Sequence, residues 1–166
     1  VGTIEPRKNI FGLIQAFVGW QKQSANDAKL VIAGAKGWKN KRIFQLIKSN
    51  PNIIYLGYVP DSDKPALYSL SPIFAYPSFY EGFGLPILEA FMSGVPVLTS
   101  NRSALTEVAG NAAYLIDPNN QSEIAIGLER LWSDKSARNY YVEKGRERAA
   151  QFSWQESAKK FMKLIN

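Results

Sequence analysis

The segment 77–89 combines two glycines and a proline with a following apolar helix. Pro86 suits the first helical position, where its missing N–H removes no hydrogen bond. The free backbone N–H groups that would gather at or just ahead of this helix N-terminus belong to Gly82, Phe83, Gly84 and Leu85. Such a terminus attracts anions, phosphate above all. The segment therefore predicts a phosphate site, with a plain tight turn as the alternative.

Glu89 is the only charged residue in the helix expected at 85–93. Because burying an unpaired charge is expensive, this carboxylate must find hydrogen-bond donors or stay protonated. Sugar hydroxyls are suitable donors. The alternative is a structural ion pair with a nearby Lys or Arg. The pattern leaves open whether Glu89 binds a sugar or only stabilises the fold.

Arg7 and Lys8 precede a helix that is expected to start near Asn9. Two cations at a helix start oppose the helix dipole, so they are poorly placed for helix stability. Arginine suits bidentate phosphate contacts and lysine suits a point-charge contact. The pair is therefore a second candidate for phosphate binding, with solvated surface charges as the alternative.

Short apolar runs alternate with helical patterns along the whole chain. The runs that predict strands are 1–5, 29–34, 53–57, 73–76, 95–99 and 113–116. Helical spacing is expected from residue 10 over about four turns, then at 41–49, 61–70, 85–93 and 104–108, and from 121 onward. This alternation implies parallel strands joined by right-handed crossovers, with helices on both faces. We therefore predict an α/β fold, a Rossmann-like doubly wound parallel sheet of about six strands.

The fold places both candidate segments at one crevice. In open α/β sheets, ligands bind outside the carboxyl ends of the strands, where the strand order reverses. The first and fourth predicted strands flank that reversal, and the segments 3–9 and 77–86 follow them. Gly57-Tyr58-Val59 ends the third predicted strand and could border a nucleobase, although the pattern favours a plain turn. We expect the two segments to meet.

The composition excludes several kinds of site. The 166 residues contain no Cys and no His, so disulfides, thiolate metal sites and histidine ligands are excluded, and we expect no metal. No apolar run approaches the roughly 20 residues that span a bilayer. The net charge of +6 suits a phosphate-bearing partner. The basic stretch around Trp38 predicts a solvated loop and helix face, not a nucleic-acid site.

The C-terminal segment carries one apolar stripe at helical spacing. Its members are Trp154, Ala158, Phe161, Met162 and Ile165. Such a stripe predicts a surface helix that packs on its own domain. The alternative is a helix that packs partly on a neighbouring domain.

Taken together, the motifs resemble the hallmark of retaining glycosyltransferases of family 4, which have the two-domain GT-B fold. The matching stretches are residues 78–90, Gly94-Val95-Pro96-Val97, and the opening residues 2–9. The family carries two Glu residues separated by seven positions, and Glu81 and Glu89 have this spacing. The resemblance covers nearly the whole chain. It implies that residues 1–166 form the C-terminal, donor-binding domain and that an N-terminal acceptor domain lies outside the chain.

The resemblance also implies roles for the site residues. Glu81 would bind hydroxyls of the donor hexose, and Glu89 would hold the ribose hydroxyls. Lys8 would neutralise the diphosphate as the nucleotide leaves, so Glu81 and Lys8 are the expected catalytic residues. The backbone N–H groups around Phe83, Gly84 and Leu85 would contact the sugar and the diphosphate.

One position departs from the family pattern. Members often carry an arginine where Thr3 stands here, and Arg7 is the candidate to replace it. The opening motif looks like that of mannosyltransferase members, which favours GDP-mannose as donor over a UDP- or ADP-sugar. The nucleotide sugar would be a substrate, and no cofactor is expected.

The expected activity is hexosyl transfer without a metal, to a sugar or a lipid-linked acceptor, by the full-length protein. The isolated domain would bind donor but transfer poorly. A cytoplasmic location is expected, with peripheral contact at the inner membrane surface left open. The alternatives are a nucleotide-sugar epimerase, a non-catalytic nucleotide-binding module, and a sugar-polymer synthase that uses ADP- or UDP-glucose.

Overall fold

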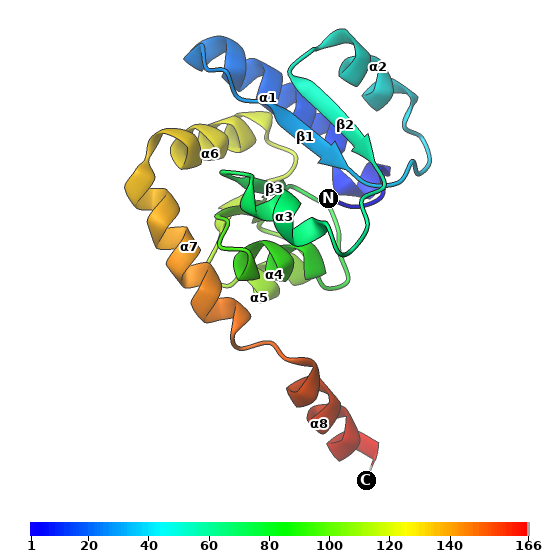
Figure 1. Cartoon of the computed structure of the whole chain (residues 1–166), viewed down its shortest axis with the longest axis vertical. Helices are drawn as coiled ribbons and strands as arrows, with labels where there is room; N and C mark the ends of the chain where they lie inside the picture. The colour runs from blue at the N-terminus through cyan, green and yellow to red at the C-terminus, as the bar shows by residue number, and fades with distance from the viewer. Residues whose placement is uncertain (166) are drawn as a thin grey trace.

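The computed structural model describes residues 1–165, apart from the side chains of Glu156 and Lys160, and consists of short parallel strands between helices (Figure 1). The strands are β1 (Leu30–Ala33), β2 (Ile53–Gly57), β3 (Phe74–Tyr76), β4 (Val97–Ser100) and β5 (Tyr114–Ile116). The helices are the 3₁₀ turn η1 (Pro6–Lys8), α1 (Ile10–Ser24), α2 (Lys41–Ser49), α3 (Lys64–Ser69), α4 (Leu85–Met92), α5 (Ala104–Ala109), α6 (Gln121–Ser133), α7 (Lys135–Ala149) and α8 (Trp154–Ile165).

The strands form two parallel groups. β1 pairs with β2, and β3 pairs with β4, which pairs with β5. The α/β prediction with a parallel sheet is confirmed, with five strands where about six were expected. The predicted strand at 1–5 lies beside β1 but forms only one isolated bridge, between Ile4 and Lys36. Gly2 has a φ of +123°, which interrupts the extended run in this part of the chain.

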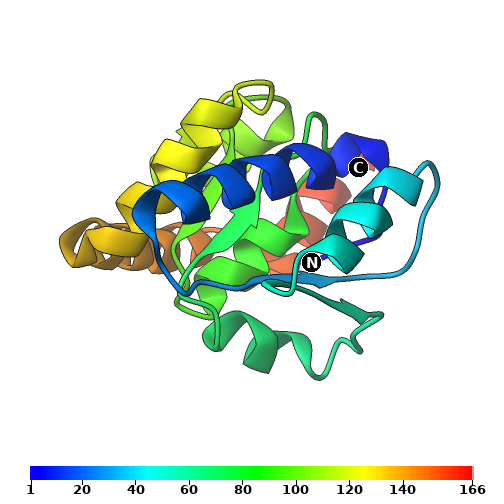
Figure 2. The ribbon, with the colours of Figure 1, turned by 90° about the horizontal axis from the view of Figure 1, so that it is seen from above.

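Each face of the β3–β4–β5 sheet packs on a different core. Figure 2, which views the ribbon from above, shows α1 and α6 on the same side of this sheet. Leu98 of β4 contributes to the core formed with α1 and α6. Its neighbour Val97 contributes to the core formed with α4 and α5. Since side chains alternate along a strand, consecutive apolar residues must be buried on both faces. Helices therefore cover both faces, as the sequence predicts.

Prolines mark the starts of α3, which begins later than expected, and of α4, which begins at the expected residue. α3 begins at Lys64 because residues 61–63 form a turn, and Pro65 lies in its first turn. α4 begins at Leu85, so Pro86 occupies the second helical position instead of the first. Proline is tolerated at both places because the first N–H groups of a helix have no intrahelical partner.

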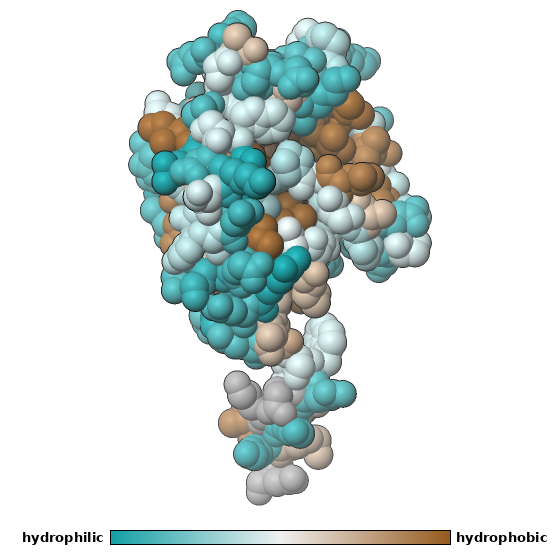
Figure 3. All heavy atoms as spheres, turned by 60° about the vertical axis from the view of Figure 1, so that its left-hand side comes forward, coloured by the Kyte–Doolittle hydropathy of each residue, from teal (hydrophilic) through white to brown (hydrophobic). Residues whose placement is uncertain are grey.

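The helix α8 does not pack on the domain, so the prediction that it does is wrong. Its apolar side chains are exposed, including Trp154 at 82% and Phe161 at 62%. In the space-filling view this end of the chain stands away from the body of the molecule (Figure 3). An amphipathic stripe specifies that a face is apolar but does not specify the surface that covers it.

Within residues 1–165, no helix is both long enough and apolar enough to cross a membrane.

Gly34 provides a test of how closely the opening segment packs beside β1. It has a φ of +146°, and a Cβ built on it would lie 1.9 Å from the carbonyl oxygen of Gly2. We expect Gly34→Ala to lower the free energy of unfolding by about 2–4 kcal/mol, because both the backbone and its neighbour must shift. Urea denaturation followed by circular dichroism measures the change.

Gly19→Ala is the matched control, since a Cβ at Gly19 has no atom within 4 Å. This substitution lies inside α1 and should raise the free energy of unfolding by up to about 1 kcal/mol. Equal stability of the two variants would contradict the close approach of the first segment to β1.

Candidate functional site

The two segments predicted to share a crevice are in direct contact. The backbone N–H of Phe79 donates to the carbonyl oxygen of Arg7 at 2.8 Å. The Arg7 guanidinium also donates to the carbonyl oxygen of Tyr80, at 3.3 Å. The turn η1 and the loop after β3 are therefore joined by backbone contacts as well as by side chains.

Asn9 allows the chain to turn sharply between η1 and α1. It has a left-handed conformation, with φ of 52° and ψ of 34°, which asparagine tolerates better than most residues. Its side-chain amide is buried and donates to the carbonyl oxygen of Pro118 at 2.7 Å. This anchor fixes the end of η1, and so it fixes the position of Lys8.

Glu81 is the centre of the site. It is 7% exposed, and its carboxylate accepts hydrogen bonds from four side chains. The donors are Lys8 at 2.8 Å, Tyr76 at 2.7 Å, Ser78 at 2.9 Å, and Arg7. Lys8 is itself 8% exposed and also donates to the hydroxyl of Tyr76. The network buries a carboxylate and an ammonium with every partner satisfied, which is what burial of charge requires.

The network fixes the protonation states of its members. Burial pushes the pKa of Glu81 upward, but the hydrogen bonds from Lys8, Tyr76, Arg7 and Ser78 outweigh it, so the pKa lies below its ordinary value. Burial, together with the hydrogen bond to Glu81, raises the pKa of the Tyr76 hydroxyl far above its ordinary value. Glu81 is therefore ionised and Tyr76 is protonated, as their hydrogen bond requires.

Arg7 is shared between two carboxylates. Besides Glu81, it forms an ion pair with Glu5 at 2.7 Å. Its side chain is 45% exposed, whereas that of Lys8 is 10% exposed. The two cations and two carboxylates balance in formal charge. Among them, Lys8 is the cation that is most removed from water, and it contacts one carboxylate.

The start of α4 depends on a glycine. Gly84 is buried and precedes the helix with a φ of +114°, where a Cβ would lie 2.8 Å from a methyl carbon of Leu105. Phe83 and Leu85, on either side, are 44% and 47% exposed. The N-terminus of α4 is thus held against α5 while its flanking residues remain accessible. Gly82 lies just ahead and is exposed.

Glu89 is half-buried, and its partner is not the Lys or Arg considered from the sequence. The hydroxyl of Tyr68 in α3 donates to its Oε2 at 2.7 Å. Glu89 borders a hollow of about 730 Å³ between α3 and α4, together with Asp61, Lys64 and Met92. A carboxylate that is oriented by one hydroxyl and borders an open hollow can accept further hydrogen bonds.

A chain of aromatic side chains connects Lys8 with Glu89. Lys8 donates to the hydroxyl of Tyr76, whose ring stacks on Phe74 with 5.6 Å between the ring centroids. Phe74 contacts Tyr68 edge-on, with 5.1 Å between the centroids, and Tyr68 donates to Glu89. The two predicted segments are therefore connected through β3 and α3.

The remaining predicted residues differ in exposure. Tyr58 is 72% exposed and follows directly after β2. Val59 is partly buried, and Thr3 is exposed beside the buried Ile4. Tyr58 therefore lies at the carboxyl end of a parallel strand.

Sequence reasoning missed three members of the site. Tyr76 and Ser78 contact Glu81, and Tyr68 contacts Glu89. Tyr76 and Tyr68 lie in apolar segments, where an aromatic residue indicates a core position. The available signal was the hydroxyl itself, since a buried Tyr O–H usually needs a hydrogen-bond partner.

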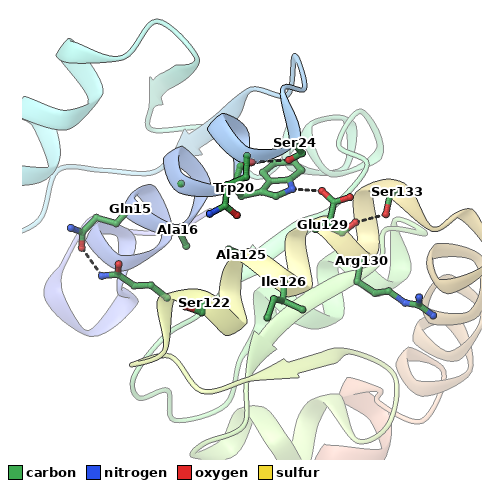
Figure 4. Close-up of a pocket in the computed structure, with 13 residues that line it drawn as sticks. Gln15, Ala16, Trp20, Ser24, Ser122, Ala125, Ile126, Glu129, Arg130 and Ser133 are labelled. Atoms are coloured by element: carbon green, nitrogen blue, oxygen red, sulfur yellow. Dashed lines mark hydrogen bonds between the residues drawn. The ribbon is translucent and has the colours of Figure 1, made fainter.

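A separate hollow of about 850 Å³ lies between α1 and α6 (Figure 4). The indole N–H of Trp20 donates to Glu129 there at 2.5 Å, and the Gln121 amide donates to Gln15 at 2.8 Å. Its polar groups therefore hold α1 and α6 together. The residues predicted to do chemistry do not line it. Among the residues that the structure describes, no group of three or more acidic side chains is suited to hold a metal ion.

The Glu81 network makes a prediction about acid stability. Because the pKa of Glu81 is lowered on folding, its stabilisation is complete above the ordinary value of 4.5 and is lost as the pH falls through the lower folded-state pKa. We expect Glu81→Gln to lower the free energy of unfolding at neutral pH by about 3 kcal/mol, because it leaves Lys8 buried without a counter-charge. It should also flatten the decline of stability below pH 4.5. Urea denaturation across this pH range measures both effects.

Glu143→Gln is the control, because Glu143 is 67% exposed and its ion pair with Arg146 lies on the surface. This variant should change stability by less than about 0.5 kcal/mol. If Glu81→Gln behaved like Glu143→Gln at neutral pH and kept the acid slope of the unsubstituted chain, the central role of Glu81 would be rejected.

Comparison with known proteins places the chain in a family. The family model described as glycosyl transferases group 1 matches residues 1–148. The chain is 44% identical over 158 residues to O-antigen chain mannosyltransferase B of Escherichia coli, covering 93% of this chain and 42% of that protein. The chain therefore spans less than half the length of that relative.

Solved structures that resemble this chain include a member of the same family. The crystal structure of the C-terminal domain of a glycosyl transferase group 1 family protein (LpcC) from Francisella tularensis is 28% identical, with a TM-score of 0.79 over 91% of this chain and 82% of that one. Anabaena HepE, solved with UDP and glucose, is 20% identical, with a TM-score of 0.86 over 99% of this chain and 47% of that one, and shows the fold. The chain belongs to the glycosyl transferases group 1 family.

Proposed function

We propose that this domain binds a nucleoside diphosphate sugar and provides the donor half of a metal-independent, retaining hexosyl transfer. GDP-mannose is the favoured donor, since the relative with 44% identity is named a mannosyltransferase and the opening motif resembles that group. The acceptor, a sugar or a lipid-linked sugar, would bind mainly to a domain outside this chain. The observation that carries the proposal is the buried Lys8–Glu81 pair beside the N-terminus of α4.

The pyrophosphate would lie between Lys8 and the start of α4. Lys8 is nearly dehydrated and is held in place by Glu81 and Tyr76, so no reorganisation is needed for it to meet an anion. The N–H groups ahead of α4, from Gly82 to Leu85, add the positive end of a helix dipole. As the sugar bond breaks, these groups would stabilise the charge that develops on the departing nucleoside diphosphate.

The two carboxylates would hold the sugars on either side. Oε1 of Glu81 accepts from three side chains, whereas Oε2 accepts from Arg7 and can still accept from a hydroxyl of the donor hexose. Glu89, oriented by Tyr68, would accept from the ribose hydroxyls. Tyr58 and Val59 would then border the base. Arg7 would hold Glu81 in position through their ion pair, and Thr3 would lie at the rim of the donor site.

Calorimetric titration tests the division of roles. GDP should bind more tightly than UDP or ADP, and GDP-mannose should bind at least as tightly as GDP. Glu89→Ala should weaken GDP binding about tenfold or more, since it removes a charge-assisted hydrogen bond to the ribose. Lys8→Ala should weaken GDP binding but leave guanosine unchanged.

Glu147→Ala is the control, because Glu147 is exposed and paired with Lys144 on α7. Its affinity for GDP should match that of the unsubstituted chain. Tighter binding of UDP or ADP would favour a glucose-polymer synthase. Failure of all three nucleotides to bind would reject the site.

We also propose that the protein works at the cytoplasmic face of an anionic membrane and that the loop after β1 touches it. Trp38 is 57% exposed in this loop and is surrounded by Lys36, Lys39, Lys41 and Arg42. An exposed Trp among cations suits the interface of an anionic bilayer, where the indole enters the headgroup layer and the cations meet lipid phosphates.

Vesicle sedimentation tests this contact. The chain should sediment with phosphatidylglycerol vesicles but not with phosphatidylcholine vesicles, and Trp38→Ala should reduce the bound fraction several-fold. Tyr140→Ala removes a comparably exposed aromatic side chain from α7 and should have no effect. Equal loss in both variants would mean that the loop has no special part in binding.

A further inference from the structure

Ser103, between β4 and α5, has a backbone conformation that residues with a side chain rarely adopt. Its φ is 54° and its ψ is −153°, so it lies outside the small left-handed helical region that such residues occasionally occupy. Glycine adopts angles of this kind freely, whereas any side chain adds a cost of backbone strain. The presence of a serine here therefore raises the question of what its hydroxyl does.

The neighbours of Ser103 in the chain hold it in this conformation. The N–H of Asn101 donates to the carbonyl oxygen of Ile116 at 2.9 Å. Arg102 forms an ion pair with Asp117 at 2.8 Å. The loop is thus bonded to the end of β5 on one side, and it continues directly into α5 on the other. Because both sides are fixed, the strain at Ser103 is imposed by the fold.

The Ser103 hydroxyl contacts the backbone of the site. Its Oγ accepts a hydrogen bond from the N–H of Glu81 at 3.2 Å. The carbonyl oxygen of the same peptide group, which belongs to Tyr80, accepts from Arg7 at 3.3 Å. Since the N–H and the C=O of a trans peptide point in opposite directions, the two bonds hold this peptide group from both sides. Rotation of the peptide group would break both hydrogen bonds.

Two more hydroxyls from the same part of the chain hold the start of the loop after β3. The hydroxyl of Thr99 donates to the carbonyl oxygen of Tyr76 at 2.8 Å. The hydroxyl of Ser100 donates to that of Ser78 at 2.6 Å. Thr99 and Ser100 are fully buried. The end of β4 therefore fixes the start of this loop, and Ser103 extends the same support further along it.

Support at Glu81 matters because two glycines follow it closely. Gly82 is exposed, and a Cβ built on it would have no atom within 4 Å, so its surroundings restrict its backbone little. Gly84 leads into α4 with a φ of +114°. The directions of the Glu81 carboxylate and of the N–H groups that follow are therefore set at the Tyr80–Glu81 peptide group.

Stability alone does not explain the serine. A hydrogen bond between neutral groups contributes little net free energy, and the strain of this backbone conformation costs at least as much. A glycine at position 103 would remove the strain and lose one such bond, so the two effects are close in size and opposite in sign. The peptide group that the hydroxyl orients is the better explanation for Ser103.

We propose that Ser103 is a positioning residue of the donor site: its hydroxyl orients the Tyr80–Glu81 peptide group and, through it, directs the Glu81 carboxylate toward the sugar of the nucleotide sugar. This inference rests on the proposed function, in which Glu81 binds the donor hexose. It adds the loop between β4 and α5 to the elements that build the site. The effect of Ser103 should therefore appear in the binding of the sugar and not in that of the nucleotide.

Hydrogen exchange tests the contact without any nucleotide. Ser103→Gly and Ser103→Ala both remove the hydroxyl and should speed exchange of the Glu81 amide about tenfold, because this amide loses its acceptor. The Phe79 amide donates to the carbonyl oxygen of Arg7 in the same loop and is the internal reference. Its exchange should not change.

The two variants also separate positioning from stability. Ser103→Gly relieves the strain as it removes the hydrogen bond, so its midpoint of urea denaturation should stay close to that of the unsubstituted chain. The midpoint of Ser103→Ala should be lower, because the strain remains. In both variants calorimetry should show the affinity for GDP-mannose falling about fivefold, while the affinity for GDP stays within about twofold.

Ala25→Gly is the matched control. Ala25 also has a positive φ, 47°, and it is exposed at the end of α1. Its replacement relieves strain without touching the loop after β3. It should change neither exchange of the Glu81 amide nor the two affinities.

Three outcomes would overturn the proposal, and they differ from one another. Unchanged exchange of the Glu81 amide in both Ser103 variants would reject the contact. Faster exchange with an unchanged ratio of the two affinities would reject the positioning role and leave the donor site intact. Failure of the unsubstituted chain to bind GDP and GDP-mannose would reject the proposed function, and the positioning role with it.

Discussion

The carboxylate of Glu81 is the constraint on which the arrangement of the site depends. Removing it from water is tolerable because side chains from two distant parts of the sequence donate to it, Lys8 and Arg7 from η1 and Tyr76 and Ser78 from the end of β3. Neither segment can move without leaving a buried charge unpaired. The loop that leads into α4 begins at this carboxylate, so the position of the helix N-terminus follows from the same network.

The network also explains how the ammonium group of Lys8 can be buried in this crevice. A dehydrated ammonium is costly unless a counter-charge is close, and Glu81 provides it for Lys8. An arriving pyrophosphate would meet Lys8 already oriented and already desolvated. A lysine on the open surface would have to lose both water and side-chain freedom on binding.

The sequence predicted the parts of the site that are local and missed those that arise from packing. The crevice could be predicted because the carboxyl ends of parallel strands meet at one edge, which brings residues 7 and 8 to Glu81. Tyr76 and Tyr68 could not, since an aromatic residue in a strand or an amphipathic helix fits the core equally well, and only the fold shows what its hydroxyl meets. The sequence predicted a longer strand at 1–5 than the structure has, because an apolar run does not reveal that Gly2 adopts a positive φ. The apolar stripe on α8 is a second example. The sequence indicates that one face of this helix is apolar but does not indicate which surface covers that face.

Charge balance separates the roles of the two cations in a way that residue type alone does not. Arginine is the better bidentate phosphate ligand in general, which would favour Arg7. In this structure, however, Arg7 contacts both Glu5 and Glu81, so two carboxylates already neutralise it. A phosphate that approached Arg7 would meet both of these negative charges. Lys8 contacts one carboxylate, which it shares with Arg7, and therefore retains more attraction for an anion. Charge balance therefore favours Lys8 as the proposed pyrophosphate ligand, with Arg7 holding Glu81 in the position that keeps Lys8 in place.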